Sequence, residues 1–294
     1  MYERLEQCPI CKSGVFNNFM ICKDHAISKE SFAIVQCKKC QFKFTNPRPV
    51  PESLPKYYQS ENYISHTNKG NNLVNLAYKI ARHFTIKNKI KFIRTFHDHG
   101  NILDYGCGTG IFIESAKRKG WNVLGIEPNE AARSHTSPKM QPFVYSDIRD
   151  IKLKKYFHII TLWHVLEHIS DLQDAIKKLK KLLHQDGKII IAVPNTASWD
   201  AQYYKEYWAG YDVPRHMYHF TPTSMNNLLA QYKLKIDATY PMTLDAYYVS
   251  LLSEKYKYGK NNYIEAIKNG YKSNKWAKKN NNNFSSIIFV ASLA

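Results

Sequence analysis

The sequence predicts an α/β protein, in which a mostly parallel sheet carries helices on both faces and follows a small metal-bound module. Two observations support this. Short apolar runs typical of buried strands alternate with amphipathic helical patterns over residues 101–193. Upstream, two closely spaced pairs of cysteines fall within residues 1–46, with the spacing of metal ligands.

The cysteine pairs predict a zinc ribbon over residues 1–46. They are Cys8 with Cys11 and Cys37 with Cys40, and 25 residues separate the pairs. Two residues between thiols let both sulfurs point at one tetrahedral ion, and four protein ligands leave no place for a reactive water. A redox pair or a disulfide is the alternative interpretation. Cys22 lies inside the spacer, where we expect a free thiol rather than a fifth ligand.

Residues 47–100 are predicted to form a linker followed by helices. Prolines at 47, 49 and 51 forbid regular helix and mark the exit from the ribbon. Apolar residues at spacings of three and four then predict helices that pack on the next domain. These positions are Leu73, Leu76, Ile80, Phe84, Ile90 and Ile93.

A ligand-binding turn is predicted at the start of the main domain, which spans residues 101–294. The apolar run 101–105 reads as a buried strand, a Gly-x-Gly-x-Gly loop follows at 106–110, and the run 111–119 is amphipathic. Strand, glycine turn and helix together form an arrangement that lets the main chain approach a ligand closely.

Acidic residues end three successive predicted strands. Asp104 belongs to the first strand, Glu127 ends the strand 121–127, and Asp147 follows the strand 142–145. A carboxylate at the second position can accept both hydroxyls of a ribose, since it offers two oxygens and no donors. Asp147 could accept from an adenine amino group, or it could simply cap a turn.

The rest of the chain supplies the remaining sheet elements. Strands are predicted at 157–162 and 188–193 with a helix at 171–184 between them, and two further strands at 234–239 and 286–291. Residues 241–283 are predicted to be an insertion that covers the pocket.

The motifs LDYGCGTG, GIEP, SDI and VLEH resemble the cofactor site of class I S-adenosylmethionine-dependent methyltransferases. The resemblance implies a Rossmann-like seven-stranded sheet with an antiparallel last strand. It implies S-adenosylmethionine as methyl donor and S-adenosylhomocysteine as product. The residues that would bind the cofactor are Asp104, Gly106, Cys107, Gly108, Gly110, Glu127, Pro128, Asp147, Ile148, Trp163 and His164.

The ribbon and the segment from Asp212 to Phe220 resemble bacterial methyltransferases associated with polysaccharide and sugar biosynthesis. The resemblance implies a small-molecule or glycan acceptor, such as a sugar or nucleotide-sugar hydroxyl or carbon. The sequence leaves open whether oxygen, nitrogen or carbon is methylated.

Histidine is the side chain best suited to deprotonate such an acceptor near neutral pH. We expect His216 to be the general base, with His168 and His164 as alternatives. A helical turn would place His164 and His168 on one face. Arg215 is predicted to anchor an anionic substrate through its forked donors, with His219 and Tyr247 beside it.

The net charge of the chain leaves two other functions possible. The net charge is +18, yet residues 101–150 contain six basic and six acidic residues. An RNA methyltransferase whose ribbon binds RNA is therefore an alternative, and a non-catalytic protein that only binds S-adenosylmethionine is another.

No run of about 20 apolar residues and no apolar leader is present, so a cytoplasmic location without a membrane span is expected.

Overall fold

The computed structural model describes residues 1–58 and 85–294. The predicted helical positions Leu73, Leu76, Ile80 and Phe84 lie outside the described residues. Contacts divide the described chain into two compact units. The first unit comprises 1–58, 164–176 and 191–289, and the second comprises 85–163, 177–190 and 290–294.

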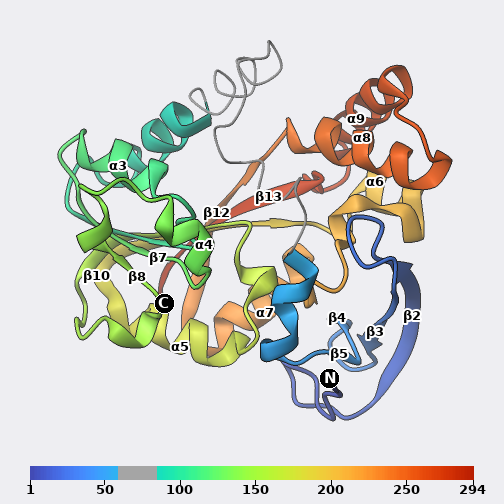
Figure 1. Ribbon diagram of the computed structural model, residues 1–294, viewed down its shortest axis with the longest axis horizontal. Helices are drawn as coiled ribbons and strands as arrows, with labels where there is room; N and C mark the ends of the chain where they lie inside the picture. Colours follow the sequence, from blue (N-terminus) through green and yellow to red (C-terminus); the bar gives the residue numbers. More distant parts are fainter. Residues whose placement is uncertain (59–84) are drawn as a thin grey trace. The chain divides into compact units, whose positions relative to one another are not determined.

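A seven-stranded sheet confirms the predicted fold class (Figure 1). The sheet is mostly parallel, with one antiparallel strand at one end. Its strands, in spatial order, are β12 (Leu234–Pro241), β13 (Ser286–Leu293), β10 (Leu183–Pro194), β9 (Phe157–Trp163), β6 (Asn101–Tyr105), β7 (Asn122–Ile126) and β8 (Val144–Tyr145).

In the second unit, β6 pairs in parallel with β7 and with β9, so that Ile102 stands opposite Val123 and Ile159. Ile102 and Ile159 are fully buried, as expected for strands covered on both faces. Helices α3 (Ile111–Lys117) and α4 (Glu130–Ser134) follow β6 and β7, and residues 85–94 are helical. The strand predicted at 142–145 is shortened by a 3-10 turn, η2 (Gln141–Phe143), which has Pro142 in its first positions.

The first unit contains the predicted ribbon. A second sheet has the order β11 (Tyr218–His219), β4 (Lys43–Thr45), β3 (Ser31–Cys37) and β2 (Phe16–Lys23), all antiparallel. Strands β1 (Tyr2–Glu3) and β5 (Arg48–Pro49) form a separate pair, and the 3-10 helix η1 (Pro51–Tyr58) follows. The ribbon therefore shares a sheet with a strand from the second half of the chain.

Helices complete this unit. They include α6 (Trp199–Tyr204), α7 (Pro222–Gln231), α8 (Asp245–Tyr258) and α9 (Tyr263–Ala277). Cys22 and Phe32 of the ribbon lie in one buried cluster with Tyr204 and Trp208. Because ribbon and later residues share this core, the contact division differs from the predicted boundaries at residues 46 and 100. Residues 241–283 form α8 and α9, and their covering role stays a prediction.

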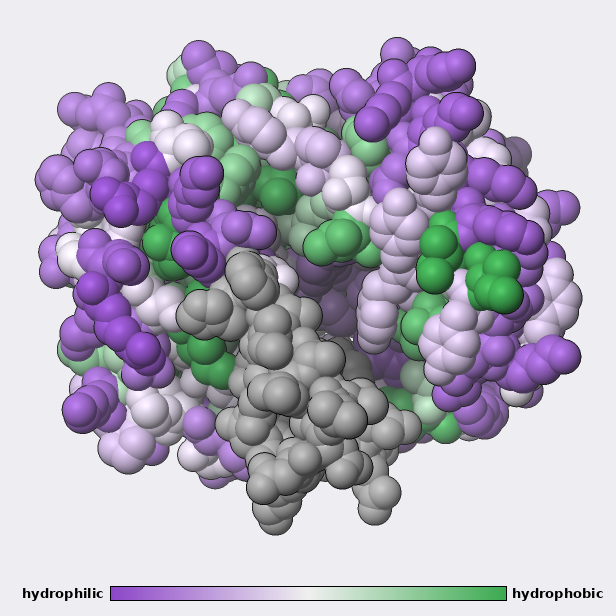
Figure 2. Space-filling model, turned by 90° about the horizontal axis from the view of Figure 1, so that it is seen from above, coloured by the Kyte–Doolittle hydropathy of each residue, from purple (hydrophilic) through white to green (hydrophobic). Residues whose placement is uncertain are grey.

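Hydrophilic side chains cover most of the face seen in Figure 2, and hydrophobic ones lie there in small separate groups. Helix α5 (Leu172–Leu182), which precedes β10, has a strongly amphipathic sequence, with apolar residues on one face and polar residues on the other. Among the described residues, no helix is both long and apolar enough to cross a membrane.

Candidate functional site

The glycine loop between β6 and α3 has the backbone that its sequence predicts. Gly106, Gly108 and Gly110 have φ angles of 79°, 55° and 76°, in the left-handed region that favours glycine. A Cβ at Gly108 would meet no described atom within 4 Å. The amide of Gly106 donates to the carbonyl of Ile126 at 2.7 Å, which fixes the loop against the end of β7.

Glu127 lies beside this loop, as predicted. Its Oε2 accepts from the amide of Gly108 and its Oε1 from the amide of Asn129, both at 2.9 Å. Burial raises the pKa of Glu127 despite these amides and the nearby Arg133. Each oxygen retains a second lone pair, so the carboxylate is oriented by the backbone and can still accept hydrogen bonds from a ligand.

Cys107 in the loop and Pro128 after Glu127, both predicted to bind the cofactor, make contacts within the protein. Cys107 is buried against β7, where a Cβ at Gly125 would lie 2.6 Å from its Sγ. Burial raises the pKa of the Cys107 thiol, which keeps it protonated. The carbonyl of Pro128 accepts from Arg133 at 2.8 Å.

Asp104 faces the interior of the sheet. Its carboxyl is 3% exposed and accepts from Thr161 Oγ1 at 2.6 Å. Burial raises the pKa of Asp104 to about 7, because water no longer stabilises the anion. The side chain therefore bridges β6 and β9.

Asp147 adopts the capping role that its sequence left open. It is the N-cap of the 3-10 helix η3 (Ile148–Asp150) and accepts from the amide of Arg149 at 2.6 Å. The Arg149 guanidinium also donates to it at 2.6 Å, and this hydrogen bond lowers the pKa of Asp147. Ile148 is buried.

Trp163 ends β9. The Lys89 ammonium lies 4.4 Å from its ring centroid, and Phe112 packs edge-on at 6.1 Å. Its indole Nε1 is buried and has no hydrogen-bond partner among the described residues.

His164, in the first unit, has a positive φ of 55°, a conformation that is rare for a residue with a side chain. The predicted helical turn is therefore wrong, and only the short 3-10 helix η4 (Leu166–His168) forms. His164 Nε2 lies 3.1 Å from Asp245 and its Nδ1 lies 3.5 Å from Glu167. Although burial opposes it, these carboxylates raise the pKa of His164 to about 10. The imidazole is thus cationic at neutral pH, which argues against its role as a base.

His168 and His216 do come together, with ring centroids 4.6 Å apart. His168 Nδ1 lies 3.0 Å from the carbonyl oxygen of Arg215, and His216 Nδ1 lies 2.9 Å from that of Gly210. Burial lowers the pKa of His168 to about 4. Glu167 joins them, 1% exposed, and one ligand atom of each of the three side chains lies within 4.8 Å of the others.

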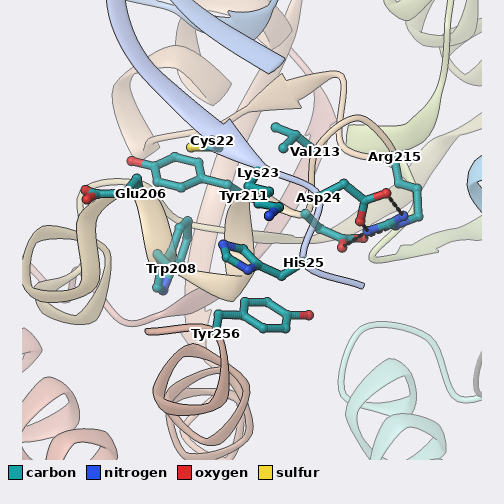
Figure 3. A pocket seen from close by; sticks show the side chains of 11 residues that line it. Cys22, Lys23, Asp24, His25, Glu206, Trp208, Tyr211, Val213, Arg215 and Tyr256 are labelled. Carbon is teal, nitrogen blue, oxygen red and sulfur yellow. Dashed lines mark hydrogen bonds and ion pairs between the residues drawn. The ribbon is translucent and has the colours of Figure 1, made fainter. Parts of the chain in front are cut away.

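Arg215 is enclosed by carboxylates (Figure 3). It is 1% exposed, and its guanidinium pairs with Asp24 at 2.9 Å and with Asp212 at 2.6 Å. A further donor reaches the carbonyl of Tyr57 at 2.9 Å. All five guanidinium N–H groups are engaged in this way. The geometry therefore favours a structural role over the predicted substrate anchoring.

The other two predicted substrate residues also have structural contacts. His219 is buried in β11, where its Nε2 lies 3.0 Å from Thr45 Oγ1, and burial lowers the pKa of His219. Tyr247 packs on α9, since a Cβ at Gly270 would lie 2.6 Å from its ring.

The four ribbon cysteines converge as predicted. Cys8 and Cys40 have sulfurs 3.5 Å apart, and Cys11 and Cys37 have sulfurs 3.4 Å apart. All four sulfurs lie within 4.8 Å of one another. Zinc–sulfur bonds of about 2.3 Å give a tetrahedron with edges of roughly 3.8 Å, so the set fits one zinc ion. Cys22 lies elsewhere, buried in β2, and burial raises the pKa of its thiol to about 12.

Sequence reasoning missed the roles of three carboxylates of this unit: Asp24 and Asp245, which pair with Arg215 and His164, and Glu167, which joins His168 and His216. Glu167 carried a signal, because it stands next to His168 in the VLEH motif. Asp24 and Asp245 lie far from their partners in the sequence and carried none.

The seven-stranded sheet and the glycine loop define a Rossmann-like α/β protein. A family described as "Methyltransferase domain" matches residues 78–239. This is more than half of the chain, and the chain belongs to this family.

Among curated proteins, the ubiquinone biosynthesis O-methyltransferase of Yersinia enterocolitica is 33% identical over 33% of this chain and 45% of its own length. The enzyme of the same name from Pelagibacter ubique is 30% identical over 40% of this chain and 49% of its own length. The chain thus spans about half the length of the curated relatives it matches.

Two solved structures have the same fold. The magnesium protoporphyrin IX methyltransferase of Synechocystis, with bound S-adenosylhomocysteine, gives a TM-score of 0.53 at 13% identity and covers 83% of this chain and 100% of its own. The geranyl diphosphate C-methyltransferase of Streptomyces coelicolor gives 0.54 at 13% identity, over 84% of this chain and 100% of its own.

Proposed function

We propose that this protein transfers a methyl group from S-adenosylmethionine to a small-molecule acceptor. The observation that carries the proposal is the Glu127 carboxylate, which the amides of Gly108 and Asn129 orient beside a loop of three left-handed glycines. Membership of the methyltransferase-domain family supports it.

The residues of the loop fit this cofactor. Gly106, Gly108 and Gly110 would contact its methionine part, and Glu127 would accept from the ribose hydroxyls with the lone pairs that the amides leave. Asp147 would accept a hydrogen bond from the adenine amino group in addition to the one from Arg149. When bound, S-adenosylmethionine supplies an already activated methyl group, so the protein mainly orients the acceptor and excludes water.

The proposed acceptor is a sugar or nucleotide sugar, methylated at a hydroxyl or a carbon. The resemblance of the ribbon and of residues 212–220 to sugar-associated methyltransferases supports this choice. His216 remains the proposed base. Its Nδ1 faces the carbonyl of Gly210, which can only accept, so Nδ1 holds the proton and Nε2 carries the free lone pair.

The ribbon is proposed to hold a structural zinc ion through Cys8, Cys11, Cys37 and Cys40. Four sulfurs would close the coordination sphere, so the ion would stabilise the fold and take no part in the reaction.

An RNA acceptor is the second candidate, favoured by the net charge of +18. A purely binding role for the fold is the third.

Titration calorimetry with S-adenosylmethionine tests the binding part of the proposal, and absence of detectable binding by zinc-loaded protein would refute it. Turnover must then be measured with nucleotide sugars, other small hydroxylated acceptors and RNA in parallel. Methylation of a sugar supports the proposed acceptor. Methylation of RNA alone would replace it, and binding without any turnover would favour the purely binding role.

A further inference from the structure

We propose that Glu167, His168 and His216 form a second metal site, which binds a divalent transition ion such as zinc or iron(II). This site is separate from the four ribbon cysteines. It lies within the first unit, and its existence does not depend on methyl transfer.

The carboxylate is the first observation. Glu167 is 1% exposed, and neither of its oxygens has a hydrogen-bond partner among the described residues. A buried carboxylate without donors is costly unless a positive charge offsets it. The cationic His164 ring lies 3.5 Å from Oε1 of Glu167, beyond a good hydrogen bond, so it offsets part of the charge while both carboxylate oxygens keep lone pairs for an ion.

The two imidazoles are oriented as ligands. In each of His168 and His216, Nδ1 lies within 3.0 Å of a backbone carbonyl oxygen. A carbonyl only accepts, so each Nδ1 carries the proton and each Nε2 presents a lone pair. The Tyr58 hydroxyl, 3.1 Å from His168 Nδ1, can accept from the same N–H. Metal-bound histidines commonly have this arrangement, in which the second ring nitrogen donates to a carbonyl that fixes the ring.

The spacing of the three side chains suits one ion. One ligand atom of each lies within 4.8 Å of the others. Ligands at about 2.0 to 2.2 Å from an ion lie at most about 4.4 Å apart, so a small rotation of the side chains closes the site. Two histidines and one carboxylate favour zinc or iron(II) over magnesium, which prefers an octahedron of oxygens.

Three protein ligands leave coordination positions open. A bound ion would take up the Nε2 lone pair of His216, which would then act as a ligand instead of a free base.

The test is the metal content of the full-length protein after exposure to Zn²⁺ or Co²⁺. We expect two ions per chain for the wild type, and one per chain for Glu167→Gln and for His216→Asn. Matched controls are Glu254→Gln and His219→Asn, which alter a buried carboxylate and a buried imidazole of the same unit outside the cluster. Both should keep two ions. Mg²⁺ should not replace the second ion.

The wild type alone can overturn the proposal if the variants fail to fold. In a Co²⁺ titration, the second equivalent should add visible ligand-field absorption without a thiolate charge-transfer band. Uptake of a single ion that is released by a thiol reagent would refute the site. Calorimetry with S-adenosylmethionine on the same samples separates the two proposals, because cofactor binding with one ion refutes only the metal site. Two ions without cofactor binding would refute only the methyltransferase function.

Discussion

Glu127 is held in place before any ligand arrives, because each of its oxygens already accepts one backbone amide. Its contribution to binding should therefore be large for a single side chain. We expect Glu127→Gln to weaken S-adenosylmethionine binding about 10- to 100-fold, the effect of losing hydrogen bonds to a charged group. Calorimetry measures the change.

Glu130→Gln is the matched control for this variant, since Glu130 is an exposed acid three residues further along the chain. It should bind as the wild type does. Equal affinity of all three proteins would show that Glu127 does not hold the ribose.

Asp104 should make stability depend on pH. Burial raises its folded pKa from 3.8 to about 7, so the folded state holds a proton that the unfolded state releases near pH 4. Its favourable contribution is complete below pH 4 and is lost as pH rises to about 7. From about pH 5 to pH 8, this group alone should lower the free energy of unfolding by roughly 2 to 3 kcal/mol.

Asp104→Asn should remove this part of the pH dependence. Urea unfolding of the cofactor-free protein at both pH values measures it. The variant would then lose less stability than the wild type on going to pH 8, and parallel curves for the two proteins would contradict the assignment.

Local motifs allowed some site residues to be predicted and left others out of reach. The glycine loop and Glu127 are encoded within about 20 residues of sequence, so their geometry follows from the motif. The environment of Arg215 depends on Asp24, which is 191 positions away. Periodicity carries no information about such a pairing, and the forked donors of Arg215 were therefore interpreted as a substrate anchor.

At the scale of elements, β6, β7 and β9 lie where apolar runs predict them, because strands buried on both faces need continuous apolar sequence. Strand β8 is shorter than predicted, because its first residues form a 3-10 turn. The pairing of β4 with β11 joins residues such as Phe44 and Tyr218. Two-residue strands leave too little pattern to be detected in a sequence.

The ribbon should depend on its metal ion. We expect Cys40→Ser to lower the zinc content by one ion per chain and to lower the melting temperature markedly. Loss of the ion would release Cys37, which ends β3, and β3 pairs with β4, which in turn pairs with β11. Elemental analysis and thermal unfolding measure the two effects.

Cys22→Ala separates metal binding from packing. Cys22 is buried outside the cysteine cluster, so this variant should keep its zinc and lose roughly 1 kcal/mol of stability from reduced apolar burial. Loss of zinc in Cys22→Ala, or its retention in Cys40→Ser, would contradict the assigned ligand set.

At the scale of the whole molecule, the domain division could not be read from composition. The prolines after residue 46 suggest a linker, yet Arg48 lies buried, 2.7 Å from Glu3 and 2.9 Å from the hydroxyl of Tyr218. These contacts join the ribbon to later residues of the same unit. A boundary drawn at the prolines therefore cuts through a shared core.

Because the whole chain carries a net charge of +18, the salt dependence of methylation should distinguish a sugar acceptor from an RNA acceptor. Binding of RNA by a protein with a net charge of +18 would release counterions, and with 6 to 10 phosphate contacts affinity would fall about 10³- to 10⁵-fold between 50 and 200 mM salt. A sugar or a nucleotide sugar makes far fewer such contacts. We therefore expect kcat/KM for the sugar acceptor to change by about twofold or less over this range. Steady-state methylation at several salt concentrations measures it, with filter binding of RNA in parallel. A steep fall in methylation that follows the RNA binding curve would instead indicate that RNA is the acceptor.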